Sequence, residues 1–166
     1  MIVVGIDSGL SGAIAVLDVS NKLLAIHDMP TVSIKSGKSV KNQLSEAMLA
    51  GILRRVKAEH AYLEFVSAMP GQGVSSMFNF GMGYGAIKGV LAALEIPFST
   101  VTPVKWQRDL SVVKGKEGNR LRAAQLFPEY AHLFTRVKDD GRADAALLAY
   151  WGSVQSYQNR IINQAK

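Results

Sequence analysis

Three short apolar segments follow one another at the start of the chain with only a few residues between them. Residues 2–7, Ala13–Asp18 and Leu23–Asp28 are rich in aliphatic and β-branched side chains, and the segments between them carry Gly, Ser and Asn. Such runs, bounded by turn-forming residues, predict β-strands. A parallel connection would need about a dozen residues or more, so strands joined by turns this short must be antiparallel neighbours. The chain is therefore expected to begin with a β-meander.

Beyond the meander, the spacing of apolar residues alternates between the periods of helices and of strands. Residues 31–39 are polar and predict a loop, whereas residues 44–56 place apolar side chains at helical spacing. Further strands are expected at residues 61–66 and Phe98–Val101, and further helices at residues 82–94, 103–110, 119–127 and 143–157. This order predicts an α/β fold with a mixed five-stranded sheet flanked by helices. No repeat or linker divides the chain, so we expect one domain over residues 1–166.

Composition restricts the chemistry that the chain can perform. With 48% hydrophobic and 19% charged residues, the sequence is typical of a compact globular protein. The absence of cysteine excludes disulfides, thiolate nucleophiles and cysteine-based zinc sites. His27, His60 and His132 lie far apart and have no metal-ligand spacing. Any bound metal must therefore be held by oxygen atoms.

The charge of the chain favours a polyanionic partner. The formal net charge is +6, and positive side chains outnumber negative ones between residues 105 and 142. No basic segment precedes the first apolar run, and no apolar stretch approaches membrane-spanning length. We therefore expect no membrane partner and a cytoplasmic location.

Three carboxylates lie in otherwise apolar runs of three different predicted elements. Asp7 ends the first strand, Glu64 lies within the fourth, and Asp144 opens the last helix. Desolvating a carboxylate is costly, and acids that cluster repel one another unless a cation joins them. Oxygen ligands suit Mg²⁺ or Mn²⁺, and two such ions can activate water and stabilise the leaving oxygen of a phosphodiester. Taken alone, Asp7 could cap the glycine turn and Asp144 could stabilise a helix N-terminus; together, the three acids favour a metal site.

Other acids are weaker candidates for metal ligands. Asp140 lies four residues before Asp144 and would reach the same side if the helix begins that early, whereas Asp139 is expected to be a solvated loop acid. Asp18 and Asp28 end strands, where a turn-facing acid is common. The predicted catalytic and metal-binding residues are Asp7, Glu64, Asp140 and Asp144.

These motifs resemble those of the RuvC-type Holliday junction resolvases, and the resemblance extends in order over nearly the whole chain. It is carried by the Gly-Ile-Asp-Ser-Gly motif around Asp7, by Glu64, and by the Ala-Asp-Ala-Ala-Leu-Leu-Ala run around Asp144. Residues 69–73, followed by Phe78, Phe80 and Gly81, and residues 103–106 are most similar to the bacteriophage branch of this family. Actin-like sugar kinases share the first motif, but they need a second lobe that 166 residues cannot supply.

The resemblance implies a ribonuclease H-like fold and a Mg²⁺-dependent endonuclease, with Mn²⁺ as a substitute, that nicks four-way DNA junctions in recombination and repair. It also implies a homodimer, and the bacterial host cytoplasm as its location if a phage encodes it. By position, Asp7 would bridge two ions, and Glu64 and Asp144 would complete the site. The last two acids of the family usually stand three apart, but Gly141 occupies that position here. The fourth ligand is therefore either Asp140 or none.

Candidate DNA contacts come from the basic part of the chain and from the loop that follows Glu64. Phosphate contacts are expected from Lys105, Lys114, Lys116, Arg120 and Arg122. The cellular enzymes place an aromatic residue just past the strand acid, but Ser67 is near that position here, so Met69, Met77 and Phe78 are the alternative stacking groups. As members of an apolar segment, these three residues could instead belong to the core.

The last expectations concern helix 82–94 and the alternatives to junction cleavage. Glycines recur at every fourth position of helix 82–94, at residues 81, 85 and 89, and allow close approach to another surface, either within the chain or in a partner subunit. We take this helix as the expected dimer contact. A non-catalytic nucleic-acid-binding module with the same fold, and a nuclease that acts on RNA–DNA hybrids, are the alternatives to junction cleavage. The intact acids favour an enzyme.

Overall fold

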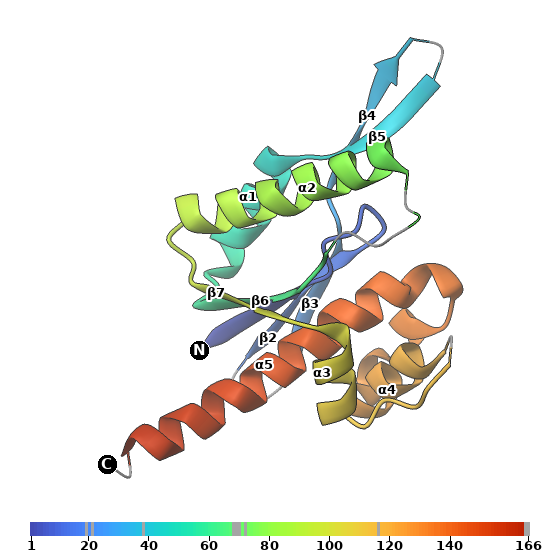
Figure 1. Cartoon of the computed structure of the whole chain (residues 1–166). Helices are drawn as coiled ribbons and strands as arrows, with labels where there is room; N and C mark the ends of the chain where they lie inside the picture. The colour runs from blue at the N-terminus through green and yellow to red at the C-terminus, as the bar shows by residue number, and fades with distance from the viewer. Residues whose placement is uncertain are drawn as a thin grey trace.

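The computed structural model describes residues 1–164, except residues 19, 21, 38, 68–70, 72 and 116. Its centre is a five-stranded sheet with the strand order β3-β2-β1-β6-β7 (Figure 1). The strands are β1 (Ile2–Ile6), β2 (Ala13–Asp18), β3 (Leu23–Asp28), β6 (His60–Glu64) and β7 (Phe98–Val101). β1, β2 and β3 are antiparallel neighbours, and β6 and β7 add to β1 in parallel. The predicted mixed five-stranded sheet and its β-meander are confirmed.

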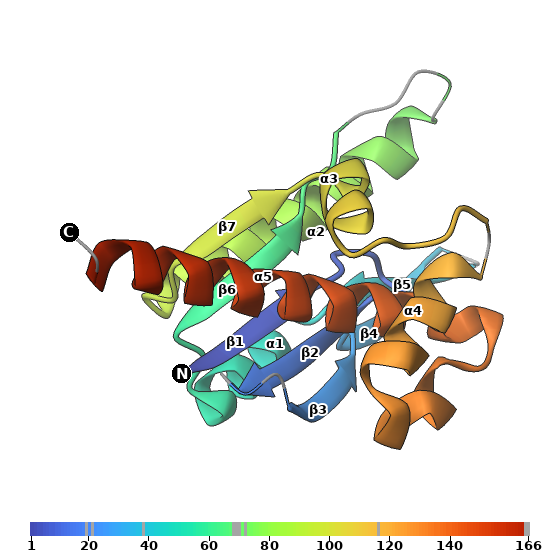
Figure 2. The same cartoon turned by 90° about the horizontal axis from the view of Figure 1, so that it is seen from below.

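Helices cover both faces of this sheet (Figures 1 and 2). Residues of β1 alternate between the two faces: Val4 and Ile6 pack with apolar side chains of α1 (Glu46–Val56) and α2 (Val74–Ala93). Val3 packs on the opposite face, with alanines and leucines of α5 (Asp140–Gln164). This period of two in the strands places a separate apolar core on each side of the sheet.

Smaller helices extend the layer that contains α5. They are α3 (Pro103–Asp109), α4 (Gly118–Leu126), and the 3-10 helices η1 (Pro128–Phe134) and η2 (Val137–Asp139). Pro103 occupies the first turn of α3, where backbone N–H groups make no hydrogen bond within the helix, so proline costs no such bond there. Among the described residues, the helices are all too short or too polar to cross a membrane.

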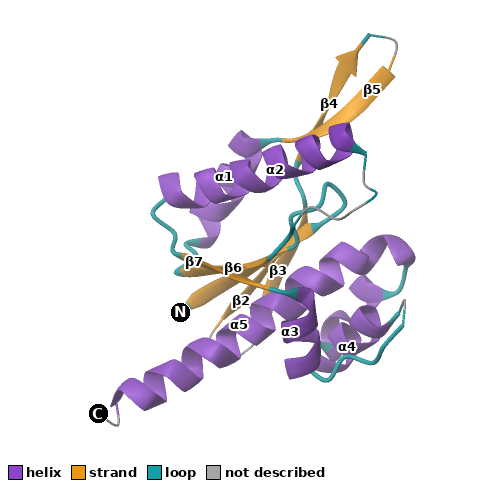
Figure 3. Ribbon diagram, viewed as in Figure 1, coloured by secondary structure: helices purple, strands orange, loops and turns teal. Residues whose placement is uncertain are grey.

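The segment predicted as a polar loop is instead a β-hairpin. β4 (Thr31–Ser36) pairs antiparallel with β5 (Ser39–Leu44), and the hairpin projects away from the five-stranded sheet (Figure 3). Val32, Ile34 and Val40 are 42%, 43% and 64% exposed. Because the hairpin packs little of itself into the core, its strands carry polar residues on both faces and give a weak strand signal in the sequence.

Helix α2 begins at Val74, well before the predicted start at residue 82, and its glycines lie on an open surface. A Cβ atom built at Gly81, Gly85 or Gly89 would have no described atom within 4 Å. Close packing within the chain therefore does not explain this glycine stripe.

Candidate active site

Asp7 directly follows β1 and opens the turn into β2. Its Oδ1 accepts a hydrogen bond from the N–H of Gly9 at 3.2 Å, and its own N–H donates to the carbonyl oxygen of Ala13 at 3.0 Å. A Cβ at Gly12 would lie 2.2 Å from the carbonyl oxygen of Asp7, so this tight turn requires glycine there. Burial raises the pKa of Asp7 above its usual range, and the Gly9 hydrogen bond opposes that shift. The turn thus fixes a partly desolvated carboxylate at the end of a central strand.

Glu64 ends the neighbouring parallel strand. Leu63 of β6 is in register with Ile6 of β1, so the next residues, Glu64 and Asp7, follow their strands at the same edge of the sheet. The pKa of Glu64 is raised to about 7, first by burial and second by repulsion from Asp7. Parallel pairing therefore brings two acids together that are distant in the sequence.

Helix α5 brings the third acid to the same edge. A Cβ at Gly5 would lie 2.1 Å from the carbonyl oxygen of Ala145, and one at Gly141 would lie 2.4 Å from that of Ser11. The two glycines therefore let the first turns of α5 lie directly against β1 and the turn after Asp7. The pKa of Asp144 is raised to about 8 by burial, then by repulsion from Asp7 and from Glu64. Asp144 thus lies within the electrostatic field of both other carboxylates, and Glu64 lies within that of Asp7.

The donor set fits a hard divalent cation. It consists of carboxylate oxygens alone, partly buried and mutually repelling, which is the arrangement that a Mg²⁺ or Mn²⁺ ion stabilises. Among the described residues, no three acidic or histidine side chains lie close enough together to hold a metal ion without moving. Like charges spread apart, so closing the shell requires a cation that draws the oxygens inward. Bound there, such ions would supply an activated water and charge stabilisation for phosphodiester hydrolysis.

Residues that the sequence analysis missed surround these acids. Nδ2 of Asn119 donates to Oδ1 of Asp144 at 2.7 Å, and Nε2 of Gln107 donates to Oδ1 of Asn119 at 3.2 Å. Trp106 is fully buried, and its indole N–H has no hydrogen-bond partner within bonding distance among the described residues. It faces Glu64 and opposes the rise of that pKa. No spacing in the sequence links these amides and this indole to the acids, so no signal could have found them.

The position where α5 begins determines which way Asp140 can point. Asp140 is the first residue of the helix, so the condition for it to share a side with Asp144 is met. Its carboxylate, however, forms an ion pair with Arg120, which also reaches Glu117 at 3.2 Å. Repulsion from Asp140 is the smallest of the effects on the pKa of Asp144. Metal binding by Asp140 remains a prediction.

Asp139 was expected to be solvated, and this expectation is wrong. Its side chain is buried and accepts hydrogen bonds from Arg136 at 2.8 and 3.0 Å. Arg142 lies 3.4 Å from it and also pairs with Asp28 at 2.6 Å. Hydrogen bonds from Arg136 lower the pKa of Asp139 to about 2. This network anchors the segment that leads into α5.

The predicted phosphate contacts have different surroundings. Lys114 is exposed. Lys105 is half exposed and pairs with Asp109 at 2.8 Å. Arg122 donates to the carbonyl oxygen of Leu110 at 2.7 Å. Arg120 is buried against two acids, which removes it from the surface cations that we expected.

The remaining DNA-binding candidates flank the start of α2. Phe78 is 66% exposed on this helix, as a stacking group would need to be. Met69 and Lys116 lie outside the described residues.

Comparison with known proteins agrees with this arrangement. The chain superimposes on Thermus thermophilus RuvC in complex with a Holliday junction substrate with a TM-score of 0.69, at 17% identity, over 95% of this chain and 96% of that one. The chain has the RuvC fold. A second Thermus thermophilus RuvC structure gives a TM-score of 0.61 at 16% identity, covering 96% and 97% of the two chains. The yeast mitochondrial Holliday junction resolvase Ydc2 gives 0.55 at 16% identity, covering 95% and 81%.

Sequence comparison gives a shorter match. The chloroplastic Holliday junction resolvase MOC1 of Chlamydomonas reinhardtii is 29% identical over 99 residues, which is 58% of this chain. The matched region spans only 11% of that relative's length. No model of a known protein family matches the chain. The resemblance to RuvC-type resolvases is confirmed, and the structural likeness establishes it for the fold.

Proposed function

We propose that this chain is a divalent-metal-dependent endonuclease that cuts four-way DNA junctions. The observation that carries the proposal is the meeting of three carboxylates, at the ends of β1 and β6 and at the start of α5, at one edge of the sheet; burial raises all three pKa values, and repulsion from neighbouring acids raises those of Glu64 and Asp144 further. Without a bound cation, such a cluster of acids destabilises the fold. Acids with pKa values perturbed in this way are typical of catalytic sites. Mg²⁺ is the proposed ion, with Mn²⁺ as a substitute.

The roles of the side chains follow from their positions. Asp7 lies next to both other acids, so it is the proposed bridging ligand, with Glu64 and Asp144 on either side of it. Asn119 fixes one oxygen of Asp144, which leaves the other oxygen to face a cation. The N–H of Trp106 faces Glu64 and would hold that carboxylate in place when a cation is bound. A bound cation would supply an activated water and stabilise the leaving oxygen.

Four-way junctions are the proposed substrate because the structures and the sequence relative with which the chain aligns are named for them. The net charge of +6 supports a nucleic-acid substrate of some kind. Branched DNA other than four-way junctions is a secondary substrate of the same proposal, since the carboxylate chemistry is indifferent to the shape of the DNA.

We also propose that the protein acts as a homodimer that places one carboxylate site on each side of a junction. The support is the open glycine stripe of α2, where a Cβ built at Gly81, Gly85 or Gly89 would meet no described atom within 4 Å. Light scattering after gel filtration should give the mass of a dimer, and Gly85→Arg should give that of a monomer. A wild-type monomer at working concentration would contradict the dimer.

The decisive assay for the proposed function compares substrates of different shape. A four-way junction, a replication fork, a flap, a linear duplex and an RNA–DNA hybrid are incubated with the protein and Mg²⁺. We expect symmetric nicks in the junction and at least about a hundredfold loss with Asp7→Asn. Asp18→Asn is the matched control, because Asp18 also ends a strand but bonds only to Ser20 and Lys22 among the described residues.

Other outcomes of this assay would refute the proposal. Equal cutting by wild type and Asp7→Asn would exclude the carboxylates from catalysis. Junction binding without cutting would identify a non-catalytic binding module. Preference for the hybrid would assign the same chemistry to RNA.

A further inference from the structure

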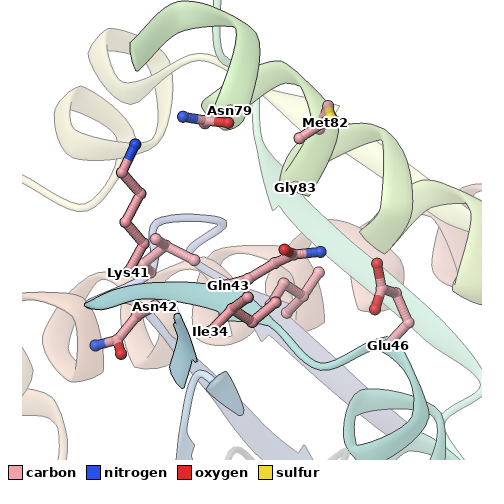
Figure 4. A pocket seen from close by; sticks show the side chains of 10 residues that line it. Ile34, Lys41, Asn42, Gln43, Glu46, Asn79, Met82 and Gly83 are labelled. Atoms are coloured by element: carbon pink, nitrogen blue, oxygen red, sulfur yellow. The ribbon is translucent and has the colours of Figure 1, made fainter. Parts of the chain in front are cut away.

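A cleft of about 580 Å³ lies between the projecting hairpin and the first half of α2. Leu10, from the turn that follows Asp7, lines it, so the cleft adjoins the predicted catalytic turn. Its volume is within the range of about 300–1,000 Å³ typical of ligand pockets. We call it the hairpin cleft; the other lining residues that matter are Ile34, Lys41, Gln43, Asn79 and Met82 (Figure 4).

The pairing of β4 with β5 determines which side chains face the hairpin cleft. Ile34 pairs with Lys41, and Val32 pairs with Gln43. Cross-strand partners share a face, as do residues two apart on one strand, so these four side chains point to one side. Figure 4 shows Lys41 extending toward Asn79 of α2 and Gln43 lying between the two walls. The cleft thus has a cation and an amide on one wall and a second amide on the other.

The opposite face of the same hairpin carries similar residue types away from the cleft. Neighbouring residues of a strand point to opposite faces, so Lys35 lies on the face opposite Ile34, and Asn42 lies on the face opposite Gln43. Asn42 also lines the cleft, but its side chain accepts a hydrogen bond from Oγ of Ser33 at 2.9 Å and points away from the cleft in Figure 4. The hairpin therefore contains its own controls: a lysine and an amide on each face.

The charges of the two walls suit a nucleic-acid strand. The sequence of residues 31–45 contains three lysines and no acid, so the hairpin attracts phosphates; Glu46, at the start of α1, is the acid that also lines the cleft. Residues 74–84, at the start of α2, contain no charged residue, and Met82, which lines the cleft, is 47% exposed. Exposed apolar and aromatic side chains suit the faces of bases. A basic wall opposite an uncharged apolar wall matches a strand with phosphates on one side and bases on the other.

We infer that the hairpin cleft receives an unstacked nucleotide of the DNA strand being cut, with Lys41 at its phosphate and Gln43 and Asn79 at its base. This inference rests on the proposed function and adds a site that reads sequence. Amide side chains both donate and accept, so they bond to the edges of bases. Ile34 and Met82 cover the face of the base. Because Leu10 joins the cleft to the turn after Asp7, a nucleotide held here fixes which phosphodiester reaches the carboxylates.

The first test measures binding without cutting. A four-way junction carrying 2-aminopurine beside the branch point is titrated with the full chain in EDTA at several salt concentrations. We expect fluorescence to rise as the base leaves its stack. Lys41→Ala should abolish that rise and reduce the salt dependence of binding by about one phosphate contact, whereas Lys35→Ala should leave the rise intact. Equal effects of the two lysine variants would overturn the inference, because the hairpin would then attract DNA only through its overall charge.

The second test reads sequence preference during cutting with Mg²⁺. Junctions with randomised nucleotides around the branch point are cut and the cut positions sequenced. We expect Gln43→Ala and Asn79→Ala to change the base preference about tenfold, and Asn42→Ala, whose side chain points away from the cleft, to leave the base preference unchanged. An unchanged preference in the first two variants would overturn the inference.

Two controls separate this inference from the proposed function and from dimer formation. If the wild type cuts no junction, the proposed function fails, and the fluorescence test still decides whether the hairpin cleft holds a base. Light scattering is applied to each cleft variant. Conversion of a dimer to a monomer by Lys41→Ala or Gln43→Ala would assign the cleft to a second copy of the chain and overturn the inference.

Discussion

Replacing Asp144 with asparagine should stabilise the metal-free protein. The pKa of this carboxyl rises from 3.8 to about 8 in the fold, first through burial and then through repulsion from Asp7 and Glu64. A folded-state pKa above the unfolded value means that the native state binds more protons, so stability falls as pH rises between about 4 and 8. The neutral amide of Asp144→Asn removes this penalty, and its oxygen still accepts the hydrogen bond from Asn119.

The size of the effect follows from the same pKa. At about 1.4 kcal/mol per pKa unit, the shift sets a ceiling of roughly 6 kcal/mol at pH 8. Relaxation of neighbouring side chains and their shared protonation reduce this, so we expect a gain of about 2–4 kcal/mol at pH 8, shrinking toward zero near pH 4.

Urea unfolding in EDTA at pH 5, 6.5 and 8 measures this gain for wild type and variant. Mg²⁺ should then stabilise the wild type at pH 8 and have much less effect on Asp144→Asn, because only the wild type has all three acids. A variant that is less stable than wild type at pH 8, or a difference independent of pH, would refute the electrostatic coupling of the three carboxylates.

Three further predictions test the surroundings of the site. Trp106→Phe removes the N–H that faces Glu64, so the pKa of Glu64 should rise and the acidic limb of the pH–rate profile should move to higher pH; an unmoved limb would exclude this role. Gly141→Ala should destabilise the fold by about 2 kcal/mol or more in thermal unfolding, because its Cβ would meet the Ser11 carbonyl at 2.4 Å. Gly51→Ala, with 3.7 Å of clearance in α1, should stabilise it by up to about 1 kcal/mol, and equal effects of the two would contradict the packing of α5 on the turn. Asp139→Asn should lower stability by about 1–3 kcal/mol at pH 7, an effect lost as pH falls through about 2, because the folded pKa lies below the unfolded one; an unchanged urea midpoint at pH 7 would count against the network.

The strands and the acids could be predicted because their signals are local. Three apolar runs with short turns leave only antiparallel pairing, and β1, β2 and β3 have that arrangement. Asp7, Glu64 and Asp144 stood out because a charge inside an apolar run needs an explanation. Their approach to one another depended on the parallel pairing of β1 with β6, which the resemblance to a known family implied.

Features that the pattern of apolar and polar residues does not reveal could not be predicted. Asp139 looked solvated because the sequence does not show that Arg136 and Arg142, each three positions away, fold around its carboxylate. The hairpin β4–β5 looked like a loop because most of its residues are polar, as befits strands whose two faces are both mostly exposed. Asn119 reaches Asp144 from 25 positions away in the sequence, and nothing in its neighbours marks it as a partner.

The central claim is that Asp7, Glu64 and Asp144 hold divalent ions at one edge of the sheet. Crystals soaked in Mn²⁺ and measured at the manganese absorption edge test it most directly. We predict anomalous peaks within about 2.5 Å of carboxylate oxygens from all three residues, and their loss in Asp7→Asn. Peaks found only at other carboxylates, or retained at full height in Asp7→Asn, would contradict the account.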